Sequence, residues 1–317
     1  MVDYEDDGHH DKKTGKIMTI GLIGCGIWGK TILRELISLN IDAKVFDPHP
    51  IIKTELADTY PQFSANSLDE LKSTDGIILA SPSATHRPVL EQIIPWNLPI
   101  FVEKPLTTSL EDAKALQQIA HDHLFMMHIW RYHAGIQLLG EIARTQKIGS
   151  ITALYTSRCN WTSPRTDTDS VWNLAPHDLT IAIEILGAIP TPKAVSIEWH
   201  NGIARGMTAL LGDNPFVQIE VSNRSVTKRR EVRLHGTKGI AVLADEKVDY
   251  IDIFYGDDHS YPSPIRQERL YFDSTPPLKR EMMAFVDFLN GGPTPISSFQ
   301  EGLYTIDLLS QLHEMAK

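Results

Sequence analysis

The sequence predicts an α/β protein of two domains: a doubly wound parallel sheet, followed by an α+β domain with a large, open, mostly antiparallel sheet. The chain has 317 residues, which is long for one hydrophobic core. Apolar runs alternate with helical patterns from residue 17 to about residue 130. Beyond about residue 150, most segments show the period-two pattern of strands that have one solvated or partner-facing side.

The first domain is expected to span residues 17–130, after a polar tail at 1–16 that we expect to be disordered. Its strands are continuous apolar runs, as in a parallel sheet that is covered on both faces. Pro88 must lie in the first turn of its helix or kink it. We expect strands at 17–24, 42–48, 75–80, 99–105 and 124–130, and helices at 29–40, 51–60, 67–73, 83–96 and 109–123.

The second domain is expected to span residues 131–317. Strands dominate it, and two helices finish the chain. We expect helices at 132–149, 171–187, 277–292 and 298–316, and strands at 150–159, 193–200, 204–212, 216–223, 230–239, 240–256 and 268–273.

Composition excludes several classes of function. The net charge is −10 and no basic stripe exists, so a nucleic-acid partner is not expected. No apolar run reaches the roughly 18 residues that a membrane helix needs, and the N-terminus has no signal-peptide core. The two cysteines, Cys25 and Cys159, cannot form a disulfide scaffold, so we expect a cytoplasmic protein. We expect no metal site, because His9 and His10 lie in the polar tail.

The stretch GLIGCGIWGK (21–30) predicts a dinucleotide site, because its glycines follow a strand and open a helix. Gly24 would allow the tight turn, Gly26 the close approach of a pyrophosphate, and Gly29 the packing of helix on strand. The amide groups at the helix N-terminus favour an anion. Ile27 and Trp28 would lie beside the cofactor, and Trp28 would also shape the loop. The alternative is a glycine-rich turn without a ligand.

Asp47 ends the next strand, about twenty residues on, where it can accept hydrogen bonds from an adenosine ribose. Its charge would repel a 2′-phosphate, and no arginine follows it. We therefore expect NAD as the cofactor rather than NADP.

Two later segments carry reactive side chains. FVEKP places Glu103 and Lys104 at the carboxyl end of a strand, where ligands bind in open α/β sheets. VWNLAPHDL places Asn173 and His177 four residues apart, on one helix face, with Pro176 expected in the first turn. His177 is suited to acid–base work near neutral pH. The alternatives are a surface turn for the first segment and a capping or core histidine for the second.

In this order and spacing, GLIGCGIWG, ILASPSATH, FVEKPL, IWRYH, KIGSI and WNLAPHD resemble the Gfo/Idh/MocA family, named for glucose–fructose oxidoreductase and inositol dehydrogenase. The resemblance covers nearly the whole chain from about residue 17. It implies a Rossmann domain, a nicotinamide in the cleft, substrate between the domains, and a homo-oligomer that pairs through the open sheet.

The resemblance also implies roles for particular residues. Lys104 and His177 fall on the family's catalytic lysine and histidine, and Ser81, Pro82, His86 and Glu103 fall near the cofactor. Asn173 stands where the family often has an aspartate. Asparagine can orient the imidazole but brings no charge, so His177 should be less basic, or Lys104 should take more of the proton work.

The stretch SPRTDTDSVWNLAPHD (163–178) is most similar to the branch that acts on nucleotide-linked sugars, such as UDP-N-acetylglucosaminuronate 3-dehydrogenases. Arg165 would then meet an anionic substrate group, unless it is a solvated loop residue. Arg131 is a weaker candidate of the same kind, or a structural residue. The expected function is hydride transfer between nicotinamide and a sugar or nucleotide-sugar carbinol, with Lys104 and His177 as the acid–base pair. The alternatives are a dehydrogenase of free polyols such as inositol, and a non-catalytic NAD-binding sensor.

Overall fold

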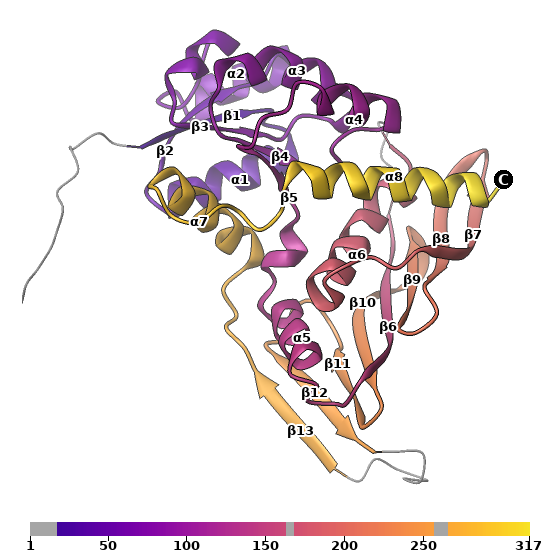
Figure 1. The fold of residues 1–317 in the computed structure, drawn as a ribbon. Helices are drawn as coiled ribbons and strands as arrows, with labels where there is room; N and C mark the ends of the chain where they lie inside the picture. Colours follow the sequence, from indigo (N-terminus) through magenta and orange to yellow (C-terminus); the bar gives the residue numbers. More distant parts are fainter. Residues whose placement is uncertain (1–17, 163–167, 257–265) are drawn as a thin grey trace, which may run out of the picture.

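The computed structural model describes residues 18–162, 168–256 and 266–317 (Figure 1). The expected disorder of residues 1–16 and the role of Arg165 therefore concern positions outside the described residues. In the described part of the chain, no helix is long and apolar enough to cross a membrane.

The first half contains the parallel sheet that the sequence predicts. Its five strands are hydrogen-bonded in the order β2-β1-β3-β4-β5, and every neighbouring pair is parallel. Three of the strands are buried along their whole length, which explains their unbroken apolar sequences. The strands are β1 (Thr19–Ile23), β2 (Asp42–Phe46), β3 (Gly76–Leu79), β4 (Ile100–Glu103) and β5 (Leu124–Met127).

The helices of this half alternate with the strands, as expected, but two segments are less regular than their sequences predict. Residues 68–73 form a 3-10 helix, and the segment 83–96 divides into a short α-helix flanked by 3-10 turns. Pro88 is the third residue of that α-helix and so lies in its first turn. The α-helices are α1 (Ile27–Ser38), α2 (Pro50–Thr59), α3 (His86–Ile93) and α4 (Leu110–Gln117).

The second half contains an eight-stranded sheet in the order β13-β12-β11-β10-β6-β9-β8-β7. Only the β6–β9 pair is parallel among these described strands, so the expectation of a mostly antiparallel sheet is confirmed. The strands are β6 (Ile151–Trp161), β7 (Pro192–His200), β8 (Ile203–Leu211), β9 (Phe216–Ser222), β10 (Arg224–Gly236), β11 (Gly239–Leu243), β12 (Tyr250–Tyr255) and β13 (Arg266–Tyr271).

Helices α5 (Ala134–Arg144) and α6 (Ser170–Leu186) pack on one face of this sheet (Figure 1). Along β9, buried Val217, Ile219 and Val221 alternate with partly exposed residues, so the opposite face is open. Helix α6 begins at Ser170, with the Asp169 side chain as its N-cap. Pro176 therefore lies inside the helix rather than in its first turn, where the sequence placed it.

The last two helices connect the halves. Helix α8 (Phe299–Met315) packs against α4 and β5 of the first half and against α6 and β7 of the second (Figure 1). Just before α8, the carbonyl of Ser297 accepts a hydrogen bond from the amide of Met126 on edge strand β5. Helix α7 (Pro277–Leu289) packs against α1, so its apolar side chains belong to the core of the first sheet.

The contribution of α7 to that core gives a test of the fold. Phe285 is fully buried, and its ring centroid lies 5.0 Å from that of Phe101 on β4. Phe285→Ala should lower the free energy of unfolding by about 3–5 kcal/mol, measured by urea denaturation, because it leaves a cavity under the sheet. Met283→Ala, on the exposed side of the same helix, should change it by less than about 0.5 kcal/mol. Equal effects of the two substitutions would contradict this packing.

Candidate active site

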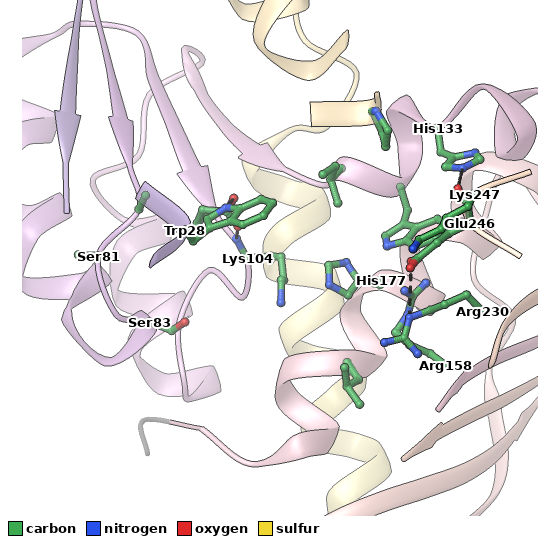
Figure 2. A pocket seen from close by; sticks show the side chains of 16 residues that line it. Trp28, Ser81, Ser83, Lys104, His133, Arg158, His177, Arg230, Glu246 and Lys247 are labelled. Atoms are coloured by element: carbon green, nitrogen blue, oxygen red, sulfur yellow. Dashed lines mark hydrogen bonds and ion pairs between the residues drawn. The ribbon is translucent and has the colours of Figure 1, made fainter. Parts of the chain in front are cut away.

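A cavity of about 600 Å³ lies where the carboxyl ends of β3 and β4 face helix α6 and strands β6 and β10 (Figure 2). Residues from both halves of the chain line it, so neither sheet forms it alone. The lining residues are Trp28, Ala80, Ser81, Ser83, Glu103, Lys104, Ile129, Trp130, His133, Arg158, Leu174, His177, Arg230, Glu246, Lys247 and Pro277.

The glycine loop between β1 and α1 has the conformation that its sequence requires. Gly24 has a φ of +90°, which residues with a side chain rarely adopt. A Cβ on Gly29 would lie 2.1 Å from the carbonyl oxygen of Gly24, so the helix start packs directly on the turn. A Cβ on Gly26 would meet no atom within 4 Å, and α1 has no side-chain cap. The helix start therefore offers amide donors beside open space, which fits a phosphate group.

Asp47, directly after β2, is hydrogen-bonded to this loop. The carboxylate accepts hydrogen bonds from the amides of Cys25 (2.7 Å) and His49 (2.8 Å), and Asp47 is buried. Each carboxylate oxygen thus has one protein donor and retains acceptor capacity for a ribose hydroxyl. Ile27, the first residue of α1, is 91% exposed beside the loop. Such exposure is expected of an apolar side chain that a bound ligand would cover.

Trp28 connects the glycine loop to the cavity. Its indole Nε1 donates a hydrogen bond to Oε1 of Glu103. Glu103 ends β4, is buried, and accepts a second hydrogen bond on Oε2 from the amide of Lys104. Glu103 thus fixes both the loop and the turn that carries Lys104.

In the segment after β3, some residues line the cavity and others are buried beside it. Ser81 lines the cavity, and exposed Pro82 precedes the following 3-10 turn. His86 is fully buried, with Nδ1 3.0 Å from the carbonyl oxygen of Pro105 and Nε2 3.0 Å from that of Ser81. These contacts connect the loops that follow β3 and β4 through His86.

Lys104 crosses from the first sheet to helix α6. Its ammonium donates hydrogen bonds to the backbone carbonyl of Asn173 (2.9 Å) and to Oδ1 of the same residue (3.0 Å). The sequence suggested that Asn173 orients His177, but these contacts assign it to Lys104. The interior Pro176 removes an amide donor from this part of α6, one turn from Asn173.

His177 lies beside Lys104 in the cavity wall (Figure 2). Burial, followed by the positive charges of Lys104 and Arg158, holds the pKa of His177 well below its ordinary value of 6.5. The imidazole is therefore neutral at pH 7 and can accept a proton. The direction is that of a weakly basic histidine, but its first cause is burial and not the missing charge at Asn173 on which the expectation was based.

Arg131 does not line the cavity. Its Nε donates to Glu184 of α6 (3.0 Å), and its Nη1 donates to Glu301 of α8 and to the carbonyl of Ile296 (2.7 Å). Glu301 also pairs with Nδ1 of His128 (2.9 Å). Of the two interpretations that the sequence left open, these contacts favour the structural one.

Two basic residues that no sequence motif indicated lie at the far end of the cavity. Arg158 on β6 and Arg230 on β10 line it, together with Glu246 and Lys247 (Figure 2). Arg158 pairs with buried Asp178 at 2.8 Å and stacks on Trp130 at 4.2 Å. Trp130 and His133 belong to the quoted stretch IWRYH, but nothing in the sequence distinguishes these arginines from ordinary surface arginines of a sheet. Among the described residues, no group of three or more histidine, cysteine or acidic side chains could hold a metal ion.

The chain is similar to known oxidoreductases. Residues 18–129 match the model of the Gfo/Idh/MocA oxidoreductase family, NAD-binding Rossmann fold. A UDP-N-acetylglucosamine 3-dehydrogenase from Acidithiobacillus ferrooxidans is 30% identical over 186 residues, which are 57% of this chain and 58% of that protein. An inositol 2-dehydrogenase from Rhizobium meliloti is 22% identical over 91% of this chain and 93% of its own length. The chain thus aligns with less than two thirds of the first of these relatives.

Solved structures extend the similarity of fold to the second half. A structure of the Acidithiobacillus ferrooxidans enzyme superposes with a TM-score of 0.80 at 22% identity, over 94% of this chain and 97% of that one. An oxidoreductase from Agrobacterium radiobacter, in complex with NAD⁺, L-tartaric acid and magnesium, superposes with a TM-score of 0.80 at 17% identity, over 95% and 96% of the two chains. The glycine loop and the Lys104 turn both lie within residues 18–129, the part of the chain that is similar to the Gfo/Idh/MocA family of oxidoreductases with an NAD-binding Rossmann fold.

Proposed function

We propose that this protein is an NAD-dependent dehydrogenase that acts on a secondary hydroxyl of a sugar or nucleotide-linked sugar. The observation that carries the proposal is the placement of Lys104 and His177 in one cavity, next to the glycine loop. The relatives named as dehydrogenases of UDP-N-acetylglucosamine and of inositol support this class of substrate.

The described residues fit a dinucleotide. The diphosphate would lie at Gly26 and the start of α1, where the structure has amide donors and open space. Asp47 would accept hydrogen bonds from the adenosine ribose, and its negative charge favours NAD over NADP. Ile27, Trp28, Ser81, Pro82 and Glu103 would flank the rest of the cofactor on its way to the cavity.

We assign the acid–base roles from the lowered pKa of His177 and from the hydrogen bonds that hold Lys104. When bound, the nicotinamide accepts the hydride that leaves the substrate carbon. Neutral His177 takes the hydroxyl proton at a ring nitrogen. The Lys104 ammonium, held by Asn173, stabilises negative charge on the same oxygen while it becomes a carbonyl. In the reverse direction the imidazolium returns the proton.

A dehydrogenase of free polyols is the second candidate, because the inositol 2-dehydrogenase relative aligns over 91% of this chain. The same two residues would serve that reaction, so the substrates separate the candidates.

We further propose that the protein acts in the cytoplasm and that its open sheet face pairs with another copy. Trp199, Ile203 and Leu210 are exposed on strands β7 and β8 of that sheet.

Substitutions in the glycine loop separate folding from cofactor binding. Gly29→Ala should lower the melting temperature, because its Cβ would meet the Gly24 carbonyl at 2.1 Å. Gly26→Ala should leave the melting temperature unchanged but weaken NAD⁺ binding at least about tenfold in a calorimetric titration, because its methyl group occupies the phosphate space. Unchanged affinity in a folded Gly26→Ala variant would argue against this cofactor site.

Substitution of the reacting pair tests the chemistry. Lys104→Met and His177→Asn should each lower kcat for sugar oxidation by about 10²–10⁴, measured as NADH absorbance, with little change in the Kd of NAD⁺. His200→Asn, an exposed histidine at the end of β7, serves as the matched control. A Lys104→Met variant with wild-type kcat would remove Lys104 from the mechanism.

The pH dependence has a defined sign. A base must be neutral, and His177 has its pKa well below 6.5, so kcat/KM for oxidation should not fall as the pH is lowered from 8 through 6.5. The fall should come at lower pH, where circular dichroism must show that the protein is still folded. A decline centred near 6.5 would indicate an ordinary histidine and contradict the assignment.

A further inference from the structure

Two arginines face each other at the end of the cavity that lies away from the glycine loop. Arg158 on β6 and Arg230 on β10 are direct partners in the antiparallel register, and both line the cavity. Like charges placed directly opposite each other in a sheet are unfavourable unless other charges compensate them. The neighbouring carboxylates therefore decide whether the pair is already neutralised.

The protein compensates the two arginines unequally. Arg158 forms a direct ion pair with Asp178, with Nε 2.8 Å from Oδ2 and both side chains almost wholly buried. Arg230 has Nε 3.6 Å from Glu246, whose other oxygen lies 2.5 Å from Nζ of Lys228. Arg230 thus shares one carboxylate with a lysine. Burial, followed by the charge of Arg158, lowers the pKa of the Arg230 guanidinium from its ordinary value, as expected beside another cation.

Both guanidinium groups are held in place. Arg158 lies over the ring of Trp130, at 4.2 Å from its centroid, in addition to its ion pair. Arg230 donates from Nη1 to the backbone carbonyls of Cys159 (3.0 Å) and Arg229 (2.9 Å). Because these contacts fix the two side chains before any ligand arrives, binding an anion between them costs little ordering entropy.

The cavity as a whole is lined by more positive than negative side chains. Its lining residues include four lysine or arginine side chains, Lys104, Arg158, Arg230 and Lys247, against two carboxylates, Glu103 and Glu246. The whole chain, in contrast, carries a net charge of −10. A positive cavity in an acidic protein attracts anions selectively, because low-dielectric walls focus its field.

We propose that Arg158 and Arg230 bind an anionic oxygen group, a carboxylate or a phosphate, on the substrate. This inference rests on the proposed function, because it assigns the substrate's charged group to the end of the same cavity. In Figure 2, His177 lies between Lys104 on one side and the two arginines on the other. A substrate anchored at the arginines would therefore extend its hydroxyl groups toward the reacting pair.

Titration calorimetry with three sugars tests this site: neutral D-glucose, D-glucuronate as the carboxylate, and D-glucose 6-phosphate as the phosphate. At least one anionic sugar should bind the wild-type protein about 10- to 100-fold more tightly than D-glucose, as expected for hydrogen bonds to charged groups. The tighter of the two anionic sugars identifies the group. Arg230→Gln should abolish the preference, and Arg230→Lys should keep part of it.

Arg229→Gln is the matched control. Arg229 is the neighbouring residue on β10, has a 45% exposed side chain, and by strand alternation points to the opposite face of the sheet. The preference for anions should survive this change, and melting temperatures should show that every variant is folded. Equal binding of the three sugars to the wild-type protein, no measurable binding of either anion, or a preference that survives Arg230→Gln would overturn the proposal.

The titrations run with and without NAD⁺, so the two proposals fail separately. Anion binding in the absence of NAD⁺ tests only the arginines. Failure to bind NAD⁺, or to form NADH, counts against the dehydrogenase alone.

Discussion

The hydrogen bonds from Lys104 to Asn173 are the contact on which the candidate site depends, because they join the two halves of the chain at the cavity. Lys104 follows the carboxyl end of β4, whereas Asn173 belongs to the helix that covers the second sheet. Both acceptors are oxygens of one residue, so the ammonium is directed without the charge that an aspartate would supply. The positive charge of Lys104 in turn contributes to the low pKa of His177. Asparagine at position 173 is therefore compatible with the proposed roles, in which Lys104 is the cation and His177 is the neutral base.

Neighbouring residues and one helix hold the Lys104–Asn173 contact in place. Glu103 accepts hydrogen bonds from Trp28 of the glycine loop and from the amide of Lys104, so one carboxylate links the glycine loop to the turn that carries Lys104. His86 braces the same turn from the other side, through the carbonyl of Pro105. Helix α8 spans both halves and packs on α6, which carries Asn173 and His177. The positions of Lys104 and His177 thus depend on packing throughout the molecule.

The sequence was sufficient for the elements of the first sheet, because parallel strands buried on both faces leave unbroken apolar runs, and glycine spacing marks the turn after β1. It was also sufficient for the mostly antiparallel second sheet, where alternation along segments such as Val217–Val221 shows which side is buried. Contacts distant in sequence were not predictable. Phe285, for example, packs against the first sheet although it follows the second sheet in the chain. The start of one helix was also misplaced: Asp169 caps α6 seven residues before Pro176, so the proline lies within the helix. The site shows the same division: Lys104 and His177 follow recognisable local patterns, whereas Arg158 and Arg230 meet only through the register of β6 and β10. The hydrogen bonds of His86 to the loops after β3 and β4 were likewise not predictable, because they join segments about twenty residues apart.

The most direct test of the account is a crystal structure of the protein grown with NAD⁺. We predict that the diphosphate lies against the amides at Gly26 and the start of α1. The nicotinamide ring should enter the cavity beside Lys104 and His177, with the adenosine ribose at Asp47. A dinucleotide bound with its nicotinamide outside this cavity, or with its diphosphate away from the glycine loop, would contradict it.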